Sequence, residues 1–88
     1  MLRVKGDSMI NAGIDDGDLL FVDRSIEARH KRIVVASING QTTVKRLYKT
    51  KDKLALMPEN PKYEPIPVQD GDDFLVFGVV TKSVKDLM

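Results

Sequence analysis

The feature that most constrains the fold is a pair of strand-forming segments joined by Asn39-Gly40. An Asn-Gly pair accepts the positive φ angles of a two-residue type I′ turn, which joins antiparallel strands without splaying them. The flanking segments, 33–38 and 41–48, are rich in β-branched residues and other strand formers. The sequence therefore predicts a β-hairpin over residues 33–48.

Further short strands are predicted on both sides of this hairpin, and no segment shows a long helical period. Residues 19–23, 53–57 and 74–81 form apolar or alternating runs that are typical of strands. Gly78 interrupts the last run, which predicts a bulge or a close backbone approach. All four prolines lie in residues 58–67, which predicts a loop or an irregular edge. We therefore expect a mainly β fold and a single compact domain of short strands and hairpins.

The composition excludes several classes of protein. With 88 residues, 42% of them hydrophobic and 31% charged, the chain is a small globular domain rather than a disordered segment. The net charge of +1 indicates neither a nucleic-acid nor a membrane partner. The lack of cysteine excludes disulfides, zinc-thiolate sites and cysteine nucleophiles. No apolar run approaches the roughly 20 residues that cross a bilayer. We expect a cytoplasmic protein that binds no cofactor and no metal.

The segment Gly6-Asp7-Ser8-Met9 is a candidate position for a nucleophile. A glycine followed by two polar residues at the start of a turn can present a hydroxyl group, and residues 9–14 can form one helical turn that ends at Gly13. The same residues also fit an ordinary turn in which Asp7 or Ser8 caps that helix, and the residues alone favour this second interpretation. The segment is not the Gly-x-Ser-x-Gly elbow of α/β hydrolases, because Ile10 replaces the second glycine.

Lys45 is the candidate base. A serine nucleophile needs a group that accepts its proton, and lysine does so only when a desolvated site lowers its pKa. Lys45 lies in the middle of a predicted strand, on the same face as Thr43 and Leu47. A surface lysine on an exposed strand face fits the residues equally well. His30, the only histidine, lies in a short basic run and is predicted to be a solvated loop residue.

Six segments carry a family resemblance. They are residues 4–9, 13–23, 33–36, 43–47, 56–63 and 76–80, and together they cover nearly the whole chain. The spacing of 37 residues from Ser8 to Lys45 also fits the family pattern. In these features the chain resembles the LexA/UmuD family of serine peptidases, and within it the UmuD-like branch most closely. The resemblance implies that residues 1–88 form one LexA/UmuD-type peptidase domain with a signal-peptidase-like β fold.

The resemblance implies a Ser-Lys dyad. Ser8 would be the nucleophile, Lys45 the general base, and the backbone N–H groups of Asp7 and Ser8 the oxyanion hole. The family's usual substrate is its own Ala-Gly or Cys-Gly bond, on an arm upstream of the serine. We expect this arm to be absent, because only seven residues precede Ser8 and the one Ala-Gly bond, Ala12-Gly13, follows it. The expected activity is therefore a serine endopeptidase that acts only on another molecule.

The resemblance also implies partners and a cellular role. Family members form homodimers through this domain, and a RecA–single-stranded DNA filament promotes their cleavage. The UmuD-like branch implies an accessory subunit of an error-prone Y-family polymerase in translesion synthesis during the SOS response. The alternative is the dimerisation and self-cleavage domain of a LexA-like or phage repressor. Asp23-Arg24-Ser25 and residues 77–80 favour the UmuD-like interpretation.

Two departures from the family pattern lead to further expectations. The chain has no helix-turn-helix segment, so we expect it to make no sequence-specific contact with DNA, and we expect no contact with a membrane. Lys31-Arg32 stands where the family often has Gly-Asp, so we expect an altered turn before the strand that begins at Ile33. Neither departure removes Ser8 or Lys45.

Overall fold

The predicted hairpin forms the centre of the structure. In the computed structural model, which describes residues 1–87, β3 (Ile33–Ile38) and β4 (Gln41–Lys49) pair antiparallel. Asn39 and Gly40 between them have φ angles of 50° and 84°, as a type I′ turn requires. The hairpin prediction is confirmed.

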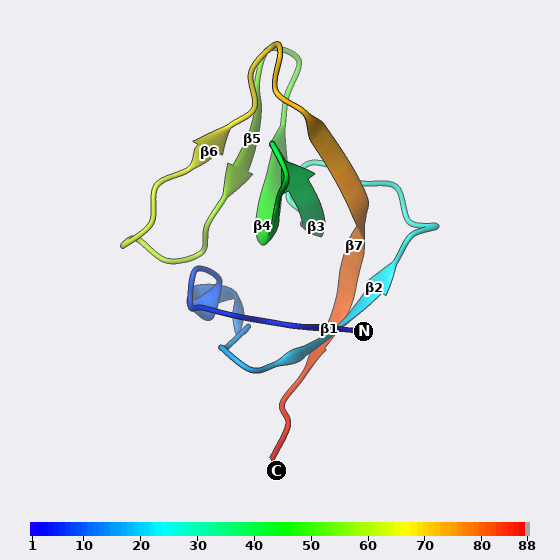
Figure 1. The fold of residues 1–88 in the computed structure, drawn as a ribbon, viewed down its shortest axis with the longest axis vertical. Helices are drawn as coiled ribbons and strands as arrows, with labels where there is room; N and C mark the ends of the chain where they lie inside the picture. Colours follow the sequence, from blue (N-terminus) through cyan, green and yellow to red (C-terminus); the bar gives the residue numbers. More distant parts are fainter. Residues whose placement is uncertain (88) are drawn as a thin grey trace.

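The strands form one antiparallel sheet in the spatial order β1-β2-β7-β3-β4-β5-β6 (Figure 1). The strands outside the hairpin are β1 (Leu2–Arg3), β2 (Leu19–Asp23), β5 (Leu54–Met57), β6 (Ile66–Pro67) and β7 (Phe74–Val84). The long β7 pairs with β3 on one side and β2 on the other, so it joins the hairpin to the N-terminal strands. The prediction of a mainly β fold is confirmed, and the proline-rich segment is an irregular edge that ends in β6.

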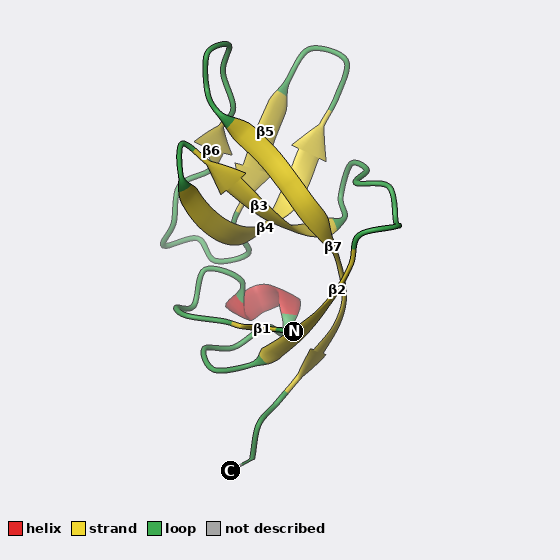
Figure 2. Ribbon diagram, turned by 45° about the vertical axis from the view of Figure 1, so that its right-hand side comes forward, coloured by secondary structure: helices red, strands yellow, loops and turns green. Residues whose placement is uncertain are grey.

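Two groups of buried apolar side chains stabilise the sheet. The first lies around the hairpin and comprises Val34, Ala36, Leu47, Leu56 and Val79. The second packs the N-terminal segment against the sheet and comprises Val4, Met9, Ile14 and Leu20. Figure 2 shows this N-terminal segment, with its short helical turn, next to the hairpin. The second group therefore fixes the position of the loop that contains Ser8.

The short helical turn differs in one respect from the sequence-based interpretation. The turn η1 (Ile10–Ala12) ends at Gly13, which has a φ of 80°, as predicted. However, no side chain caps its first turn, so the interpretation in which Asp7 or Ser8 caps the helix is wrong. The hydroxyl group of Ser8 is instead hydrogen-bonded to the amine of Lys45.

The turn before β3 contains a residue in an unfavourable backbone conformation. Lys31 has a φ of 76°, in the left-handed region that glycine favours. Its N–H donates to the carbonyl of Leu47 at 2.7 Å, and its carbonyl accepts from Nη1 of Arg46 at 2.6 Å. These contacts with β4 hold the lysine in a conformation that glycine adopts without strain.

Gly78 allows β7 to pass close to β2. The pairing of β7 with β3 shifts register between Val35 and Ala36, next to Gly78. A Cβ atom on Gly78 would lie 2.6 Å from Cγ1 of Val22 and 3.0 Å from the carbonyl oxygen of Asp23. Both features that the sequence predicts here, a bulge and a close backbone approach, are confirmed.

We expect Gly78→Ala to lower the free energy of unfolding by about 1–3 kcal/mol, the usual cost of overpacking. The added methyl group would collide with a β-branched side chain, which has little rotamer freedom, and with backbone. Urea denaturation of the single variants and of Val22→Ala/Gly78→Ala measures this effect. The double variant should lose less free energy of unfolding than the sum of the two single losses. Without Cγ1 of Val22, the added methyl group no longer collides with that side chain. A Gly78→Ala protein as stable as the wild type would contradict the close approach.

Candidate active site

Ser8 and Lys45 lie in contact although 37 residues separate them in the sequence. Nζ of Lys45 is 2.8 Å from Oγ of Ser8. Ser8 lies in the loop between β1 and η1, and Lys45 lies near the middle of β4. Both line a cleft of about 250 Å³, together with Leu2, Arg3, Val4, Lys5, Met9, Thr42, Thr43 and Val44. The structure thus brings together the two side chains that the sequence suggested as nucleophile and base.

Lys45 is a buried lysine, with 8% of its surface exposed. Its neighbour on the same strand face, Leu47, is 2% exposed, so the predicted alternation is confirmed and the surface-lysine interpretation is wrong. Burial lowers the pKa of the Lys45 amine, because the charged form loses its hydration. Within the described residues, no carboxylate forms an ion pair with this amine. The surroundings therefore favour the neutral form.

The hydrogen-bond partners of Nζ also suit a neutral amine. Besides Oγ of Ser8, Nζ contacts Oγ1 of Thr43 at 2.6 Å and the carbonyl of Val44 at 3.1 Å. A neutral amine has two N–H donors and one lone pair. When it donates to Thr43 and Val44, its lone pair is available to the O–H of Ser8. The sequence placed Thr43 on the correct face, and that position is the signal that could have identified it as a site residue.

The backbone before Ser8 is shaped by Gly6. Gly6 has a φ of 91°, which strains any residue with a side chain, and its N–H donates to Oδ1 of Asp16 at 2.7 Å. Among the described residues, the next two N–H groups, those of Asp7 and Ser8, donate to no protein acceptor. Two adjacent backbone donors at the nucleophile therefore remain available for an oxygen of a ligand.

The loop that follows β5 holds the residues around the nucleophile. The Asn60 side chain donates through Nδ2 to the carbonyl of Asp7 at 3.0 Å, and the N–H of Glu59 donates to the carbonyl of Ser8 at 2.8 Å. The Tyr63 hydroxyl donates to the Asp7 carboxylate, and this hydrogen bond raises the pKa of Tyr63. The sequence predicted a loop or an irregular edge here and the family resemblance included part of it, but the pattern carries no signal that predicts these contacts.

The residues that line this cleft include neither His30 nor any aspartate or glutamate. The side chain of His30 is exposed, as predicted for a solvated loop residue, and its Nδ1 accepts a hydrogen bond from the N–H of Lys49 at 3.0 Å. Over residues 1–87, no group of three or more histidine, aspartate or glutamate side chains could hold a metal ion. The same stretch contains no helix long and apolar enough to cross a membrane.

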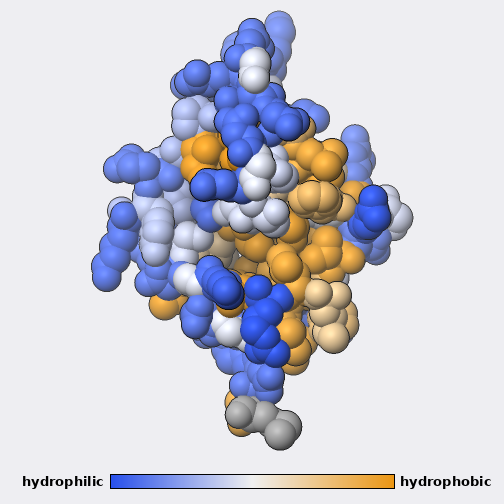
Figure 3. All heavy atoms as spheres, in the orientation of Figure 1, coloured by the Kyte–Doolittle hydropathy of each residue, from blue (hydrophilic) through white to orange (hydrophobic). Residues whose placement is uncertain are grey.

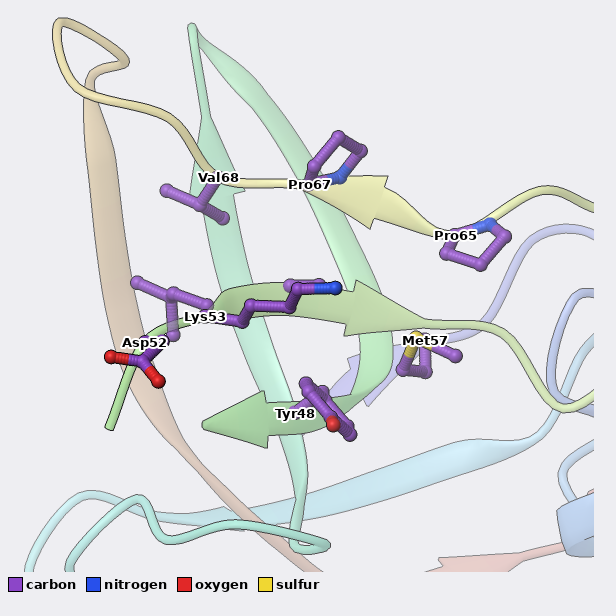
Figure 4. Close-up of a pocket in the computed structure, with 9 residues that line it drawn as sticks. Tyr48, Asp52, Lys53, Met57, Pro65, Pro67 and Val68 are labelled. Atoms are coloured by element: carbon purple, nitrogen blue, oxygen red, sulfur yellow. The ribbon is translucent and has the colours of Figure 1, made fainter. Parts of the chain in front are cut away.

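A larger pocket of about 630 Å³ lies beside β5 and β6 (Figure 4). Its lining comprises Tyr48, Asp52, Lys53, Leu54, Ala55, Met57, Pro65, Pro67 and Val68. Figure 4 shows Pro65, Pro67 and Val68 on the segment that includes β6, which runs beside β5. The lining contains no serine or threonine, and its one hydroxyl group, that of Tyr48, makes no hydrogen bond with Asp52, Lys53 or another of the described residues. The smaller cleft with Ser8 and Lys45 is therefore the candidate active site.

We expect the stability of the protein to reveal the buried amine through its pH dependence. Because the pKa of Lys45 is lowered from 10.5 on folding, the unfolded chain binds more protons between the folded pKa and about 10.5. The stability of the wild type should therefore rise with pH across this window, by at most about 1.4 kcal/mol per pH unit from this group. Lys45→Met should lack this rise and should be more stable than the wild type below the window.

Urea denaturation from neutral pH to about pH 10.5 measures this difference between the two proteins. Lys49→Met, on an exposed residue of the same strand, is the control and should keep the wild-type pH dependence. A difference between the wild type and Lys45→Met that stays constant with pH would contradict a lowered pKa of Lys45.

Comparison with known proteins gives the family. Peptidase S24-like proteins match residues 1–81. Over 85 residues the chain is 51% identical to LexA repressor 2 of Pseudomonas syringae pv. tomato, covering 97% of this chain and 42% of that protein. It is 48% identical over 87 residues to LexA repressor 1 of Geobacter sulfurreducens, covering 98% and 43% of the two chains. It is 59% identical over 70 residues to a LexA repressor of Desulfitobacterium hafniense, covering 80% and 34%.

These relatives confirm the LexA/UmuD resemblance but give no support to the preference for its UmuD-like branch, since all three carry the name of LexA repressors. The chain spans about two fifths of the length of the relatives it matches. The family match covers nearly all of its residues, and the mainly β fold agrees with that match. The chain therefore belongs to the Peptidase S24-like family, which is the LexA/UmuD family that the sequence resembles.

Proposed function

We propose that this chain is the self-cleavage and dimerisation domain of a LexA-like repressor, a serine endopeptidase with Ser8 as nucleophile and Lys45 as base. The observation that carries the proposal is the 2.8 Å contact between Oγ of Ser8 and the amine of a buried lysine. The names of the relatives favour this repressor over the polymerase accessory subunit. Nothing in the comparisons supports a Y-family polymerase as partner.

The proposed chemistry follows from the positions of the two side chains. The neutral Lys45 amine takes the proton of the Ser8 hydroxyl while Oγ attacks the carbonyl carbon of the scissile peptide. The N–H groups of Asp7 and Ser8 donate to the oxyanion of the tetrahedral intermediate. Lys45 then gives the proton to the leaving amine, and an acyl group remains on Ser8. A water molecule, deprotonated by Lys45, hydrolyses that ester and restores the free serine.

Burial is what makes lysine suitable for this role. A solvated lysine is protonated at neutral pH and cannot accept the proton of a serine. The lowered pKa of Lys45 increases the fraction of molecules with a neutral amine. We therefore expect the cleavage rate to increase with pH until the amine is fully deprotonated.

Cleavage of a second molecule tests the proposed dyad. The substrate is a full-length LexA-like protein whose own serine is replaced by alanine, and its Ala-Gly or Cys-Gly cut is followed on a gel. The wild-type chain should cleave it faster at higher pH, whereas Ser8→Ala and Lys45→Ala should lose about 10³-fold or more in rate, as expected for either member of such a pair.

Ser25→Ala is the matched control, because Ser25 lies in an exposed loop where its hydroxyl donates to the Asp23 carboxylate. It should cleave at the wild-type rate. Cleavage by Ser8→Ala at the wild-type rate would disprove the assignment of the nucleophile. A wild-type chain that cleaves nothing across this pH range would contradict the peptidase proposal.

Exposed apolar side chains along β2 and β7 support the proposed homodimer. Phe21, Leu75 and Phe77 are 42%, 55% and 41% exposed. Figure 3 shows apolar residues gathered on the side of the molecule where Figure 1 places these two strands. A contiguous apolar surface of this kind typically marks a protein interface.

The RecA–single-stranded DNA filament as a partner and the cytoplasmic location stay predictions that rest on the family resemblance.

We expect Leu75→Glu to convert a dimer into a monomer, because burying a carboxylate in an apolar interface without a partner is costly. Sedimentation equilibrium over a range of concentrations measures the association constant, which should fall by about 10-fold or more. Ile10→Glu is the control: Ile10 is also exposed, at 45%, but lies in η1. Equal association of both variants would contradict the placement of the interface.

A further inference from the structure

A buried asparagine outside the Ser8–Lys45 pair holds the peptide group that leads into the nucleophile. Asn60 is 7% exposed, and both ends of its amide are used. Nδ2 donates to the carbonyl of Asp7 at 3.0 Å, and Oδ1 accepts from the N–H of Lys62 at 3.0 Å. Because one partner is an acceptor and the other a donor, only one orientation of the amide satisfies both. The asparagine therefore presents a fixed donor to Asp7.

This contact also fixes the direction of the Ser8 N–H group. The peptide bond between Asp7 and Ser8 is planar and trans, so the N–H of Ser8 points away from the carbonyl of Asp7. A donor that fixes the carbonyl on one side of the peptide group fixes the N–H on the other side. That N–H donates to no protein acceptor among the described residues. Its direction thus depends on what holds the carbonyl.

Other contacts in the loop cannot replace this one. The Asp7 carbonyl also accepts from the N–H of Ile10, but at 3.3 Å, which makes Asn60 its closer donor. The N–H of Glu59 holds the carbonyl of Ser8, which belongs to the next peptide group. The hydroxyl of Tyr63 holds the carboxylate of Asp7 and leaves its peptide group free to rotate.

We propose that Asn60 is a positioning residue that aims the N–H of Ser8 at the oxyanion of the proteolytic intermediate. It acts through the Asp7–Ser8 peptide group and touches neither substrate nor Lys45. This inference rests on the proposed peptidase function and adds a residue on which the oxyanion hole depends. Loss of the Asn60 donor should reduce stabilisation of the transition state and should leave substrate binding and the protonation of Lys45 unchanged.

The test is Asn60→Asp, assayed for cleavage of a peptide that contains the scissile bond. The new carboxylate keeps the size of the side chain and the acceptor for the Lys62 N–H, but it replaces the donor to Asp7 with an acceptor. We expect kcat to fall by about 10-fold to 100-fold, part of the loss seen when an oxyanion donor is removed. KM should stay at the wild-type value. The pH midpoint of kcat is compared in Asn60→Ala, which adds no charge, because a new buried carboxylate near Lys45 would itself raise the pKa of that amine.

Two further variants serve as controls. Asn11→Asp adds the same charge on an exposed neighbouring residue and should leave kcat within about two-fold of the wild type. Asn60→Ala leaves room for a water molecule to donate to the Asp7 carbonyl, so it should fold and should lose less activity than Asn60→Asp. If Asn60→Asp does not show the cooperative unfolding of a folded protein, the test relies on Asn60→Ala. That variant should have a reduced kcat and an unchanged pH midpoint.

Two results would overturn the inference while leaving the dyad intact. The first is a kcat within about two-fold of the wild type in both Asn60 variants. The second is a loss of activity in Asn60→Ala that comes with a shifted pH midpoint, since Asn60 would then act on the protonation of Lys45. A wild-type protein without Ser8-dependent cleavage would overturn the proposed function, and this inference with it, so the two failures are distinguishable.

Discussion

The burial of one amine, that of Lys45, is the constraint on which the rest of the site depends. An isolated charge in apolar surroundings is costly, and within the described residues no carboxylate compensates this one. Two hydroxyl groups and one carbonyl surround the amine, which is enough to satisfy a neutral group. These surroundings lower the pKa of the amine and so favour the form of the lysine that can accept a proton, and the protein loses stability whenever the amine is charged.

The sheet holds this amine in place, and a second set of contacts brings the serine to it. The carboxylate of Asp18 is 3% exposed and accepts hydrogen bonds from the N–H of Asp15, the hydroxyl of Ser83 and the amine of Lys85. The backbone hydrogen bond of Asp15 contributes most to lowering the pKa of this carboxyl group. The carbonyl of Asp18 accepts from the N–H of Val4. The end of β7 therefore fixes the turn to which the segment before Ser8 is bonded.

The parts of this arrangement that depend on local patterns were predictable from the sequence. Asn39-Gly40 determines its turn by its own φ angles, and a period of two placed Lys45 on the same face as Leu47. The contact with Ser8 was not predictable in this way, because no periodicity relates residues so far apart, and only the family resemblance suggested it. The position of Asn60 was not predictable either, because an irregular, proline-rich loop has no repeat from which to infer contacts.

The loop that holds Ser8 is tied to the strand that holds Lys45, so one register controls both halves of the site. Strand β5 pairs directly with β4, with Leu56 opposite Leu47, and the loop follows within a few residues. The guanidinium of Arg46 pairs with the Glu59 carboxylate and ties the loop back to β4. A slip of one residue between β4 and β5 would turn the apolar set to the opposite face. It would also move the loop relative to the amine, so the apolar pattern that selects the sheet register also sets the distance between nucleophile and base.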